Sequence, residues 1–362
     1  MVTTARASPP RPVGPGSGRR TPSTSAPAVR RPALVLLVAL AVLVAAVVAS
    51  IAVGTALLSP RQVWEALVAP TGTEADVVVR QLRIPRTELG ILVGVGLGVA
   101  GALMQGHTRN PLADPGLLGV SAGAGFALVV STRSLGLANP VAVVGAAFVG
   151  ALAASLLVFG LSSLGSSGRR GGTTPVTMAL AGLAVSELLI AVTSALVLGD
   201  GTSLDAYRFW SAGALDDRGA GLVGVVAPFV VAGLVLAAVN APALNVLSLG
   251  EDMARGLGQR LGLARGVGVV AITLLAGAAV AVSGPVAFVG LVAPHIVRTF
   301  TGPDHRWLLP GAGIVGASLV LVADVVGRLV VRPGELQVGI VLGIVGAPFF
   351  IYLVRRHRMV RL

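Results

Sequence analysis

Long apolar runs separated by short polar segments cover this chain from residue 32 to residue 354. The runs are rich in Gly, Ala, Val and Leu, and they lack the apolar–polar alternation of a barrel strand. About 20 apolar residues form one helical crossing of a bilayer, and a helix satisfies its own backbone hydrogen bonds there. The pattern predicts an all-α integral membrane protein of about ten spans: 33–57, 87–106, 116–132, 140–163, 174–198, 220–240, 265–283, 285–299, 308–326 and 337–354.

The stretch from 265 to 299 is open to two interpretations. Gly284-Pro285 interrupts its apolar run. Proline cannot donate a helix hydrogen bond and commonly ends or kinks a helix. The stretch therefore contains either two spans or one span followed by a re-entrant segment.

Small residues recur inside the runs at helix-packing spacing. Gly94 and Gly98 form one Gly-x3-Gly pair, and Gly339 and Gly343 form another. Such pairs let helix backbones approach closely in lipid. Residues 96–101 and 311–316 also match the Gly-x-Gly-x-x-Gly pattern of dinucleotide sites. Each lies inside an apolar run with no preceding strand, so we interpret both as packing glycines.

Composition supports a membrane protein, and charge orients it. Hydrophobic residues make up 54% of the 362 positions and charged residues 12%, whereas soluble domains carry about 25% charge. The net charge of +12 comes mainly from arginines in two acid-free tails, at residues 1–31 and from Arg355 onward. Arginine beside spanning helices marks the cytoplasmic side. We therefore predict a multi-pass protein of the cytoplasmic (plasma) membrane with both termini in the cytoplasm, and no nucleic-acid partner.

The tails and the apolar body also suggest the domain organisation. Residues 1–31 are basic and rich in Pro and Ser, with too little apolar surface to offset the entropy of ordering. We expect a disordered cytoplasmic tail there. Residues 32–362 are expected to form a single transmembrane domain.

Missing residue types exclude several kinds of chemistry. Without cysteine the chain has no disulfide, thiolate nucleophile or cysteine-ligated metal. Without lysine it cannot form the phosphate-binding Gly-x4-Gly-Lys-Ser/Thr loop, so an ATP-driven step needs another protein. The four histidines are scattered, and no residues form a recognisable nucleophile–base set. We therefore predict no metal site and no catalytic site, which also argues against an intramembrane enzyme.

Two acidic residues lie deep within predicted spans, Glu187 and Asp324. Intramembrane acids are typical of ion-coupled secondary transporters, which are an alternative function class. Asp324 lies one helical turn from Arg328, and this spacing favours a structural ion pair over a proton relay. Transport that fails when ATP is depleted, and not when an ion gradient is lost, would distinguish an ATP-driven transporter.

The first polar cluster is Arg83-Ile84-Pro85-Arg86, at the predicted external start of the second span. Proline suits the first turn of a helix. The two arginines, which have few acids near them in the sequence, allow two interpretations. They are interfacial side chains that extend to water, or they form a rigid cationic patch for an acidic partner.

The second cluster, residues 105–116, joins the second and third spans on the predicted cytoplasmic side. Its prolines and Asn110 are typical of an ordinary turn. The turn is also long and polar, and a Gly/Ser-rich segment at 119–123 follows it. That combination is expected where backbone lines a water-filled cavity.

The third cluster, residues 249–258, lies in the longest predicted cytoplasmic loop. Leu249, Met253 and Leu257 recur at helical spacing, while the charged residues lie off this stripe. We predict a short amphipathic helix. It either lies on the membrane face or fits a groove on a partner.

Further polar segments follow in the C-terminal half, at 283–295, 302–306, 323–328, 332–340 and 346–350. In this order, the clusters resemble the FecCD family of ABC-importer permeases over roughly residues 33–356. Members of that family move iron–siderophores, haem or cobalamin. The resemblance implies the type II ABC-importer permease fold with ten spans per subunit. It also implies that this chain holds no cofactor, because ATP and Mg are bound by a partner ATPase.

The resemblance further implies partners and residue roles. Two permease subunits surround a central pathway, two ATP-binding cassette subunits drive it, and an extracytoplasmic binding protein delivers the ligand. Arg83, Arg86 and Arg328 match external arginines that receive glutamates of the binding protein. Asn110 and Leu112 match a cytoplasmic gate. The 249–258 helix matches the coupling helix that enters the ATPase groove, through Leu249, Gly250, Glu251, Met253, Ala254, Leu257 and Gly258.

The match departs from the family at two places near the start of the last span. Gln337 replaces a usual proline, and Leu342-Gly343 replaces the commoner Thr-Ala. A pathway lined by small residues would suit a large, weakly held ligand. Ferric siderophore is the expected cargo because it is the commonest in the family, with cobalamin and haem as alternatives. The second permease subunit is either a second copy or a paralogue.

Overall fold

The structure is a computed structural model that describes residues 32–164, 175–215 and 221–355. The predicted tail at 1–31 and the arginines beyond residue 355 lie outside the described residues. Within them the chain is helical and contains no strand. Each of the ten predicted spans is occupied by a helix: α1 (Pro32–Ala52), α4 (Ile84–Thr108), α5 (Val120–Arg133), α6 (Pro140–Leu164), α7 (Pro175–Leu198), α9 (Gly221–Leu247), α11 (Leu261–Ser283), α12 (Val289–Thr301), α13 (His305–Val330) and α14 (Val338–Arg355).

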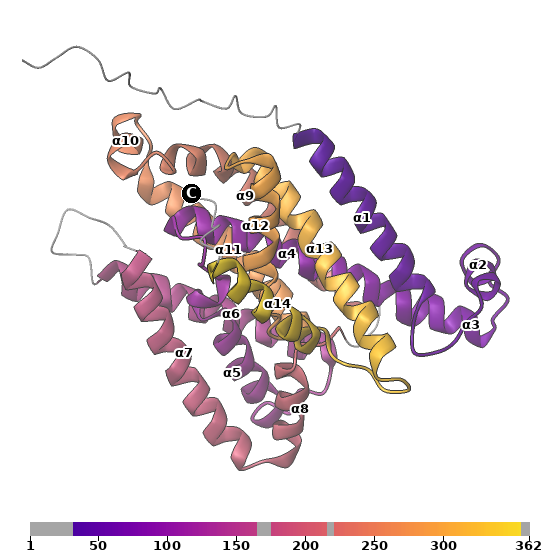
Figure 1. Cartoon of the computed structure of the whole chain (residues 1–362). Helices are drawn as coiled ribbons and strands as arrows, with labels where there is room; N and C mark the ends of the chain where they lie inside the picture. The colour runs from indigo at the N-terminus through magenta and orange to yellow at the C-terminus, as the bar shows by residue number, and fades with distance from the viewer. Residues whose placement is uncertain (1–31, 165–174, 216–220, 356–362) are drawn as a thin grey trace, which may run out of the picture. The chain divides into compact units, whose positions relative to one another are not determined.

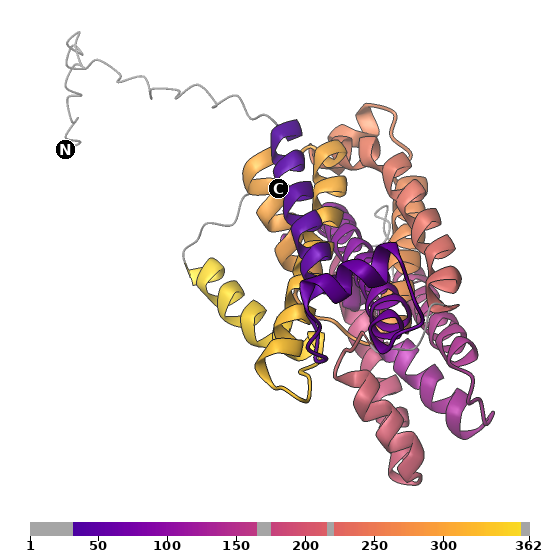
Figure 2. The same cartoon turned by 90° about the vertical axis from the view of Figure 1, so that its right-hand side faces the viewer.

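Short helices occupy several of the segments between the long helices, and the one predicted in 249–258 is among them. They are α2 (Pro60–Val68), α3 (Glu74–Val77), the π-helical turn η1 (Val78–Arg83), the 3-10 turn η2 (Pro115–Leu118), α8 (Gly201–Ser211) and α10 (Glu251–Gly256). α10 lies at one end of the helix bundle, and α2, α3 and α8 lie toward the other (Figures 1 and 2). We refer to these as the α10 end and the α2 end.

α4 is the central helix of the bundle and packs against α13, α11, α12 and α9. Two glycines allow its closest approach, to α13. A methyl group at Gly94 would overlap the backbone of Ala317, and one at Gly98 would overlap the carbonyl group of Ala312. The predicted role of this glycine pair in helix packing is confirmed. Its counterpart Gly343 has open space around it within this subunit.

The segment predicted as a span at 285–299 contains a helix that is shorter than a full crossing. Residues 284–288 are not helical, and α12 is a helix of 13 residues. At 1.5 Å per residue, α12 is about 20 Å long, against a hydrocarbon core of ~30 Å. The segment still crosses the bundle, because α11 begins beside α10 and α13, antiparallel to α4, also begins at the α10 end. The two-span interpretation therefore describes it better than the re-entrant one. The Gly284-Pro285 break makes the first part of this crossing non-helical, and Phe288 takes a left-handed φ of 68° before the helix begins.

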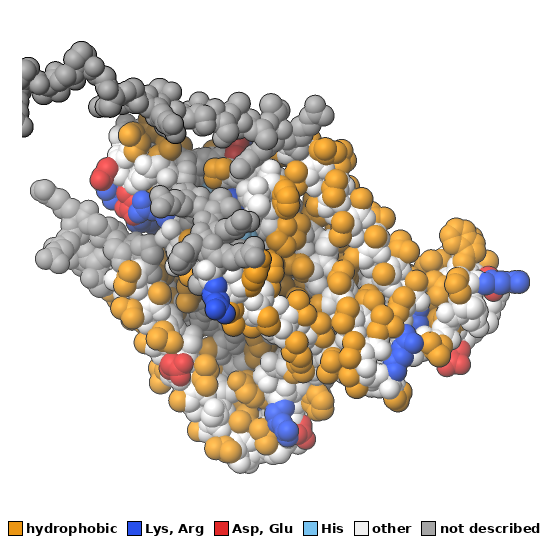
Figure 3. Space-filling view, in the orientation of Figure 1, with side chains coloured by type: hydrophobic (Ala, Val, Ile, Leu, Met, Phe, Trp, Pro, Cys, Tyr) orange, Lys and Arg blue, Asp and Glu red, His pale blue; other side chains and the backbone are white. Residues whose placement is uncertain are grey.

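The surface matches a bilayer environment. Seven helices of the described chain are long and apolar enough to cross a membrane, while α5 and the described part of α14 are shorter apolar helices. Hydrophobic side chains cover most of the face in Figure 3, and charged side chains lie mainly near α10, near α2 and near α8. The protein is a multi-pass membrane protein.

Candidate functional site

Three arginines converge on the end of α1 at the α2 end. Arg83, Arg328 and Arg332 donate to the backbone carbonyl oxygens of residues 50–54 and 56, at N···O distances of 2.7–3.1 Å. The last carbonyl groups of a helix lack partners within the helix, and cations there also interact favourably with the helix dipole. These arginines therefore fix the end of α1, a helix whose side chains are mostly exposed.

A buried carboxylate, Asp324, holds two of the site arginines. Nη2 of Arg86 donates to its Oδ1 at 2.8 Å, and Nη2 of Arg328 lies 2.8 Å from its Oδ2. Asp324 is 1% exposed. A second acid, Glu335, lies 3.0 Å from Nη1 of Arg86, and its side chain is 37% exposed. The predicted Asp324–Arg328 pair is confirmed, and Arg86 joins it from 238 residues away in the sequence.

The expectation that few acids lie near these arginines is wrong for Arg86, which pairs with both Asp324 and Glu335. Arg83, Arg86 and Arg328 are 4%, 7% and 3% exposed. Asp324 and Glu335 neutralise Arg86 and Arg328, and backbone carbonyl groups hold Arg83. Apolar surroundings make an unpaired charge costly, so burial and pairing come together. A docking role stays a prediction, and a carboxylate from outside would have to compete for donors already in use.

The predicted gate residues lie in the tight turn after α4, at the α10 end. Arg109 caps α4 with φ 50° and ψ 33°, in the left-handed region that a non-glycine residue seldom adopts. Oδ1 of Asn110 accepts a hydrogen bond from the backbone N–H of Leu112 at 3.0 Å, which closes an Asx turn. Asn110 and Leu112 are exposed, while the next residue, Ala113, is buried. The gate residues therefore lie on the surface of their own subunit.

The predicted coupling helix is present but shorter than 249–258. α10 has six residues, and the flanking Gly250 and Gly258 take φ values of 106° and 79°. Glycine adopts such angles without the penalty of a Cβ atom. The chain therefore changes direction at both ends of α10, which forms a distinct short unit between α9 and α11.

The predicted apolar stripe of this segment is open. Leu249, Met253 and Leu257 are 63%, 58% and 62% exposed. Ala254 is fully buried against its own subunit, so it anchors the helix and is not available to a partner. The expected place of Ala254 among the residues that enter the ATPase groove is therefore corrected.

Glu251 links α10 to its surroundings. Its carboxylate accepts a hydrogen bond from Nη2 of Arg265 on α11 at 2.6 Å, and it lies 3.3 Å from Nη2 of Arg255. It also forms an ion pair of 3.6 Å with Arg109, the residue that begins the turn after α4. The predicted coupling helix and the predicted gate turn are thus in direct contact. The sequence pattern did not indicate this link, because it joins segments about 140 residues apart.

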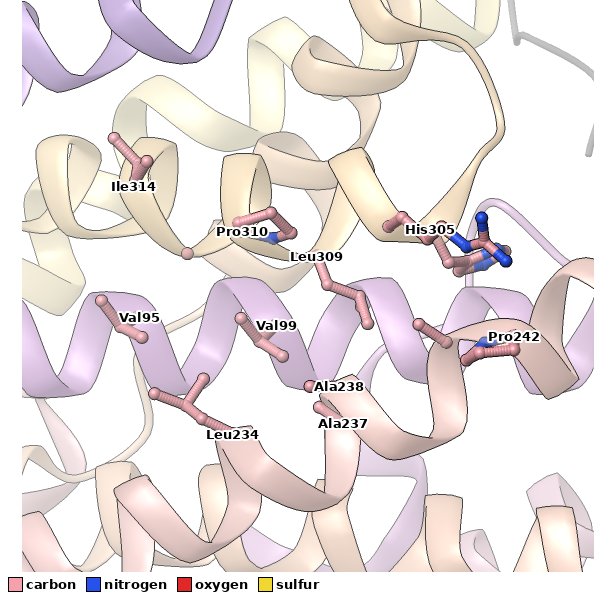
Figure 4. A pocket seen from close by; sticks show the side chains of 13 residues that line it. Val95, Val99, Leu234, Ala237, Ala238, Pro242, His305, Leu309, Pro310 and Ile314 are labelled. Carbon is pink, nitrogen blue, oxygen red and sulfur yellow. The ribbon is translucent and has the colours of Figure 1, made fainter. Parts of the chain in front are cut away.

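A hollow of about 620 Å³ lies between α4, α9 and α13 (Figure 4). Val95, Leu234 and Ile314 line its apolar part, and His305 and Arg306 lie at one end. A smaller hollow of about 140 Å³ adjoins residues 285–287, and the polar residues Asp114 and Ser121 also line it. Across the described residues, no three His, Asp or Glu side chains come together in a way that could hold a metal ion.

Comparison with known families identifies the chain's relatives. Residues 42–356 match the FecCD transport family. The chain belongs to this family. The glycine-packed α4, the short exposed α10 and the turn that contacts α10 are thus features of a member of the FecCD transport family.

The similarity to curated relatives extends over nearly the whole length of each relative. The chain is 43% identical over 330 residues to the ferric enterobactin transport system permease protein FepD of Escherichia coli (strain K12), covering 91% of this chain and 96% of the relative. It is 38% identical over 323 residues to the probable siderophore transport system permease protein YfiZ of Bacillus subtilis (strain 168), covering 89% and 96%. It is also 38% identical over 334 residues to the hemin transport system permease protein HmuU of Yersinia pestis, covering 91% and 97%.

A solved structure shares the fold. A metal-chelate type ABC transporter in an inward-facing conformation matches with a TM-score of 0.78 and 27% sequence identity, over 90% of this chain and 99% of the other. The all-α ABC-importer permease fold predicted from the sequence is confirmed. The glutamine at 337 does not prevent the last helix from forming, since α14 begins at Val338 and the carbonyl group of Gln337 accepts from Ile340.

Proposed function

We propose that this chain is the membrane-spanning permease subunit of a binding-protein-dependent ABC importer for ferric siderophores. The observation that carries the proposal is its near full-length similarity to siderophore permeases, together with an exposed apolar stripe on α10. The chain supplies the translocation pathway. Two ATP-binding cassette subunits hydrolyse ATP, because no phosphate-binding loop is possible in a chain without lysine.

The α10 end supplies the contact with the ATPase. Three large apolar side chains exposed on a six-residue helix suit insertion into an apolar groove. Under this proposal the α10 end and both termini lie in the cytoplasm, in agreement with the arginine-rich tails of the sequence. The α2 end then faces outward, where a binding protein would approach Arg86 and Glu335.

A second permease subunit, a copy or a paralogue, would complete the pathway. The gate role of Asn110 and Leu112 requires that the two turns meet at a two-fold axis. In a homodimer, Leu112→Cys should form a disulfide in the closed state, since the chain has no other cysteine and a disulfide needs Cα atoms about 4.4–6.8 Å apart. The cross-link should block uptake. If no cross-link forms in any nucleotide state of a homodimer, the turn does not lie at the two-fold axis.

The decisive experiment is uptake of labelled ferric siderophore by the complete importer in proteoliposomes. We expect uptake to require ATP inside and binding protein outside, and to persist when ion gradients are collapsed. Haem is the second candidate cargo, because a hemin permease is among the relatives at 38% identity. Competition between unlabelled haem, cobalamin and ferric siderophore would identify the cargo. Uptake driven by an ion gradient without ATP would overturn the proposal.

A further inference from the structure

α7 carries an ionisable side chain near its middle. Glu187 is the thirteenth of its 24 residues, and the helix is about 36 Å long at 1.5 Å per residue. Glu187 therefore lies near mid-depth of a spanning helix. Its side chain is exposed, and no hydrogen bond or ion pair holds it within the described part of the subunit.

Glu187 lies on the face of α7 that points away from its own subunit. α7 packs through Val185, which is 5% exposed, and through Gly182, where a methyl group would overlap the carbonyl group of Leu117. Positions 185 and 187 are about 200° apart around a helix of 3.6 residues per turn. The carboxylate is thus nearly opposite the packed side and meets whatever lies beyond the subunit.

Lipid is a poor candidate for that surrounding. Ionised side chains are strongly disfavoured in the hydrocarbon core, and those found in spanning helices face a protein interior or a water-filled cavity. The exposed neighbours of Glu187 one turn away are Leu183 and Ala184 on one side and Ile190 and Ala191 on the other. The two alanines leave room for water next to the carboxylate, beside the larger Leu183 and Ile190.

We propose that Glu187 lines the water-filled translocation pathway at mid-depth, where its charge favours a ferric chelate of neutral or positive net charge over an anionic one. The carboxylate attracts cations and repels anions of the same size in an aqueous space. With two copies around one pathway, the effect would be doubled. The pathway and its solute rest on the proposed importer function. The access of water to this face of α7 and the local potential can be measured without transport.

The test uses the assembled transporter in lipid vesicles, both without nucleotide and with ATP. Ala191→Cys introduces a single thiol one turn from Glu187, about 6 Å away. Its reaction rates with a cationic and an anionic methanethiosulfonate reagent are compared. A unit charge about 6 Å away in water should favour the cationic reagent about tenfold over the anionic one. We expect Glu187→Gln to abolish this preference and Glu187→Asp to keep it.

Val48→Cys is the matched control, because Val48 is 60% exposed on the apolar surface of α1. It should react with neither charged reagent. If Ala191→Cys is equally unreactive in both nucleotide conditions, that face of α7 meets lipid or another subunit, and the proposal is overturned. An unchanged reagent preference in Glu187→Gln would overturn the electrostatic role. ATP-dependent uptake, measured separately, tests the importer function itself.

Discussion

The two ends of the bundle hold their charged residues in different ways. At the α2 end, Arg86 and Arg328 pair with Asp324, and all three residues are at most 7% exposed. At the α10 end, Glu251 pairs with Arg109 and Arg265, and the side chains of Glu251 and Arg109 are 27% and 42% exposed. The first cluster lies inside the protein, while the second lies at its surface.

This difference separates residues that hold the fold from residues that can move. The buried cluster joins α1, α4 and α13 and leaves few donors for an outside partner. The exposed cluster lies beside a helix bounded by left-handed glycines, with an open apolar stripe. Partly exposed ion pairs contribute little to stability and can be exchanged at small cost. Residues of the first cluster thus serve the folding of the subunit, whereas residues of the second cluster are available to partner proteins.

The largest effect is expected from Asp324→Ala. Removing this carboxylate leaves two buried guanidinium groups without their shared counter-ion, and loss of one partner from a buried pair destabilises by about 3–5 kcal/mol. Thermal unfolding of the purified subunit should shift strongly downward, with a low yield of folded protein. Stability like that of the unmodified protein would show that the cluster is not needed for folding.

The same argument changes how docking can be tested. Exchanging Arg83, Arg86 and Arg328 together for Glu would place carboxylates against backbone carbonyl oxygens inside the subunit. Loss of uptake would then report misfolding. A docking test needs a residue at the rim of the cluster, such as the half-exposed Glu335.

A second prediction concerns the exposed stripe at the α10 end. Met253→Asp should release the ATPase from the purified complex, because a buried Met side chain typically contributes about 2–5 kcal/mol, and a groove should give the lower figure. The control is Asp252→Asn, whose side chain is fully exposed and lies off the stripe. Co-purification of ATPase at the normal yield with Met253→Asp would show that α10 merely lies on the membrane.

Sequence periodicity predicted the helices well, but it predicted only some of the contacts between them. The apolar runs located α4 and α13, and the spacing of Gly94 and Gly98 indicated their close packing, because both signals are local. Arg86 and Asp324 could not be paired this way, since their contact depends on how two distant helices are placed. For Ala254, helical spacing alone could not show that the side of α10 with this small residue faces its own subunit. The short α12 was left open because a Gly-Pro break is compatible with two geometries.

A third, smaller effect should follow from separating α10 and the gate turn. We expect Glu251→Gln and Arg109→Gln each to lower the uptake obtained per ATP hydrolysed, with the ATPase still bound. The double variant should be no worse than Glu251→Gln alone, because that change already removes the pair with Arg109 along with those to Arg255 and Arg265. The coupling energy between Glu251 and Arg109 should be about 0.5–1 kcal/mol. Arg61→Gln breaks an exposed pair with Glu65 on α2 and should have no effect. Additive losses in the double variant would mean that the two residues act separately.

The smallest effect is expected at Glu335, the exposed member of the otherwise buried cluster at the α2 end. Glu335 pairs with Nη1 of Arg86, while Asp324 pairs with Nη2 of the same arginine. Glu335→Gln should weaken this internal hold with little change in thermal stability. A carboxylate of the binding protein would then meet less competition, and its affinity should rise about twofold to fivefold, in line with a half-exposed ion pair. The control is Glu65→Gln, which removes the same charge at the α2 end without touching Arg86. Binding measured on the purified importer decides the outcome: affinity equal to the control would mean that Arg86 does not receive the binding protein and serves only to hold α4 to α13.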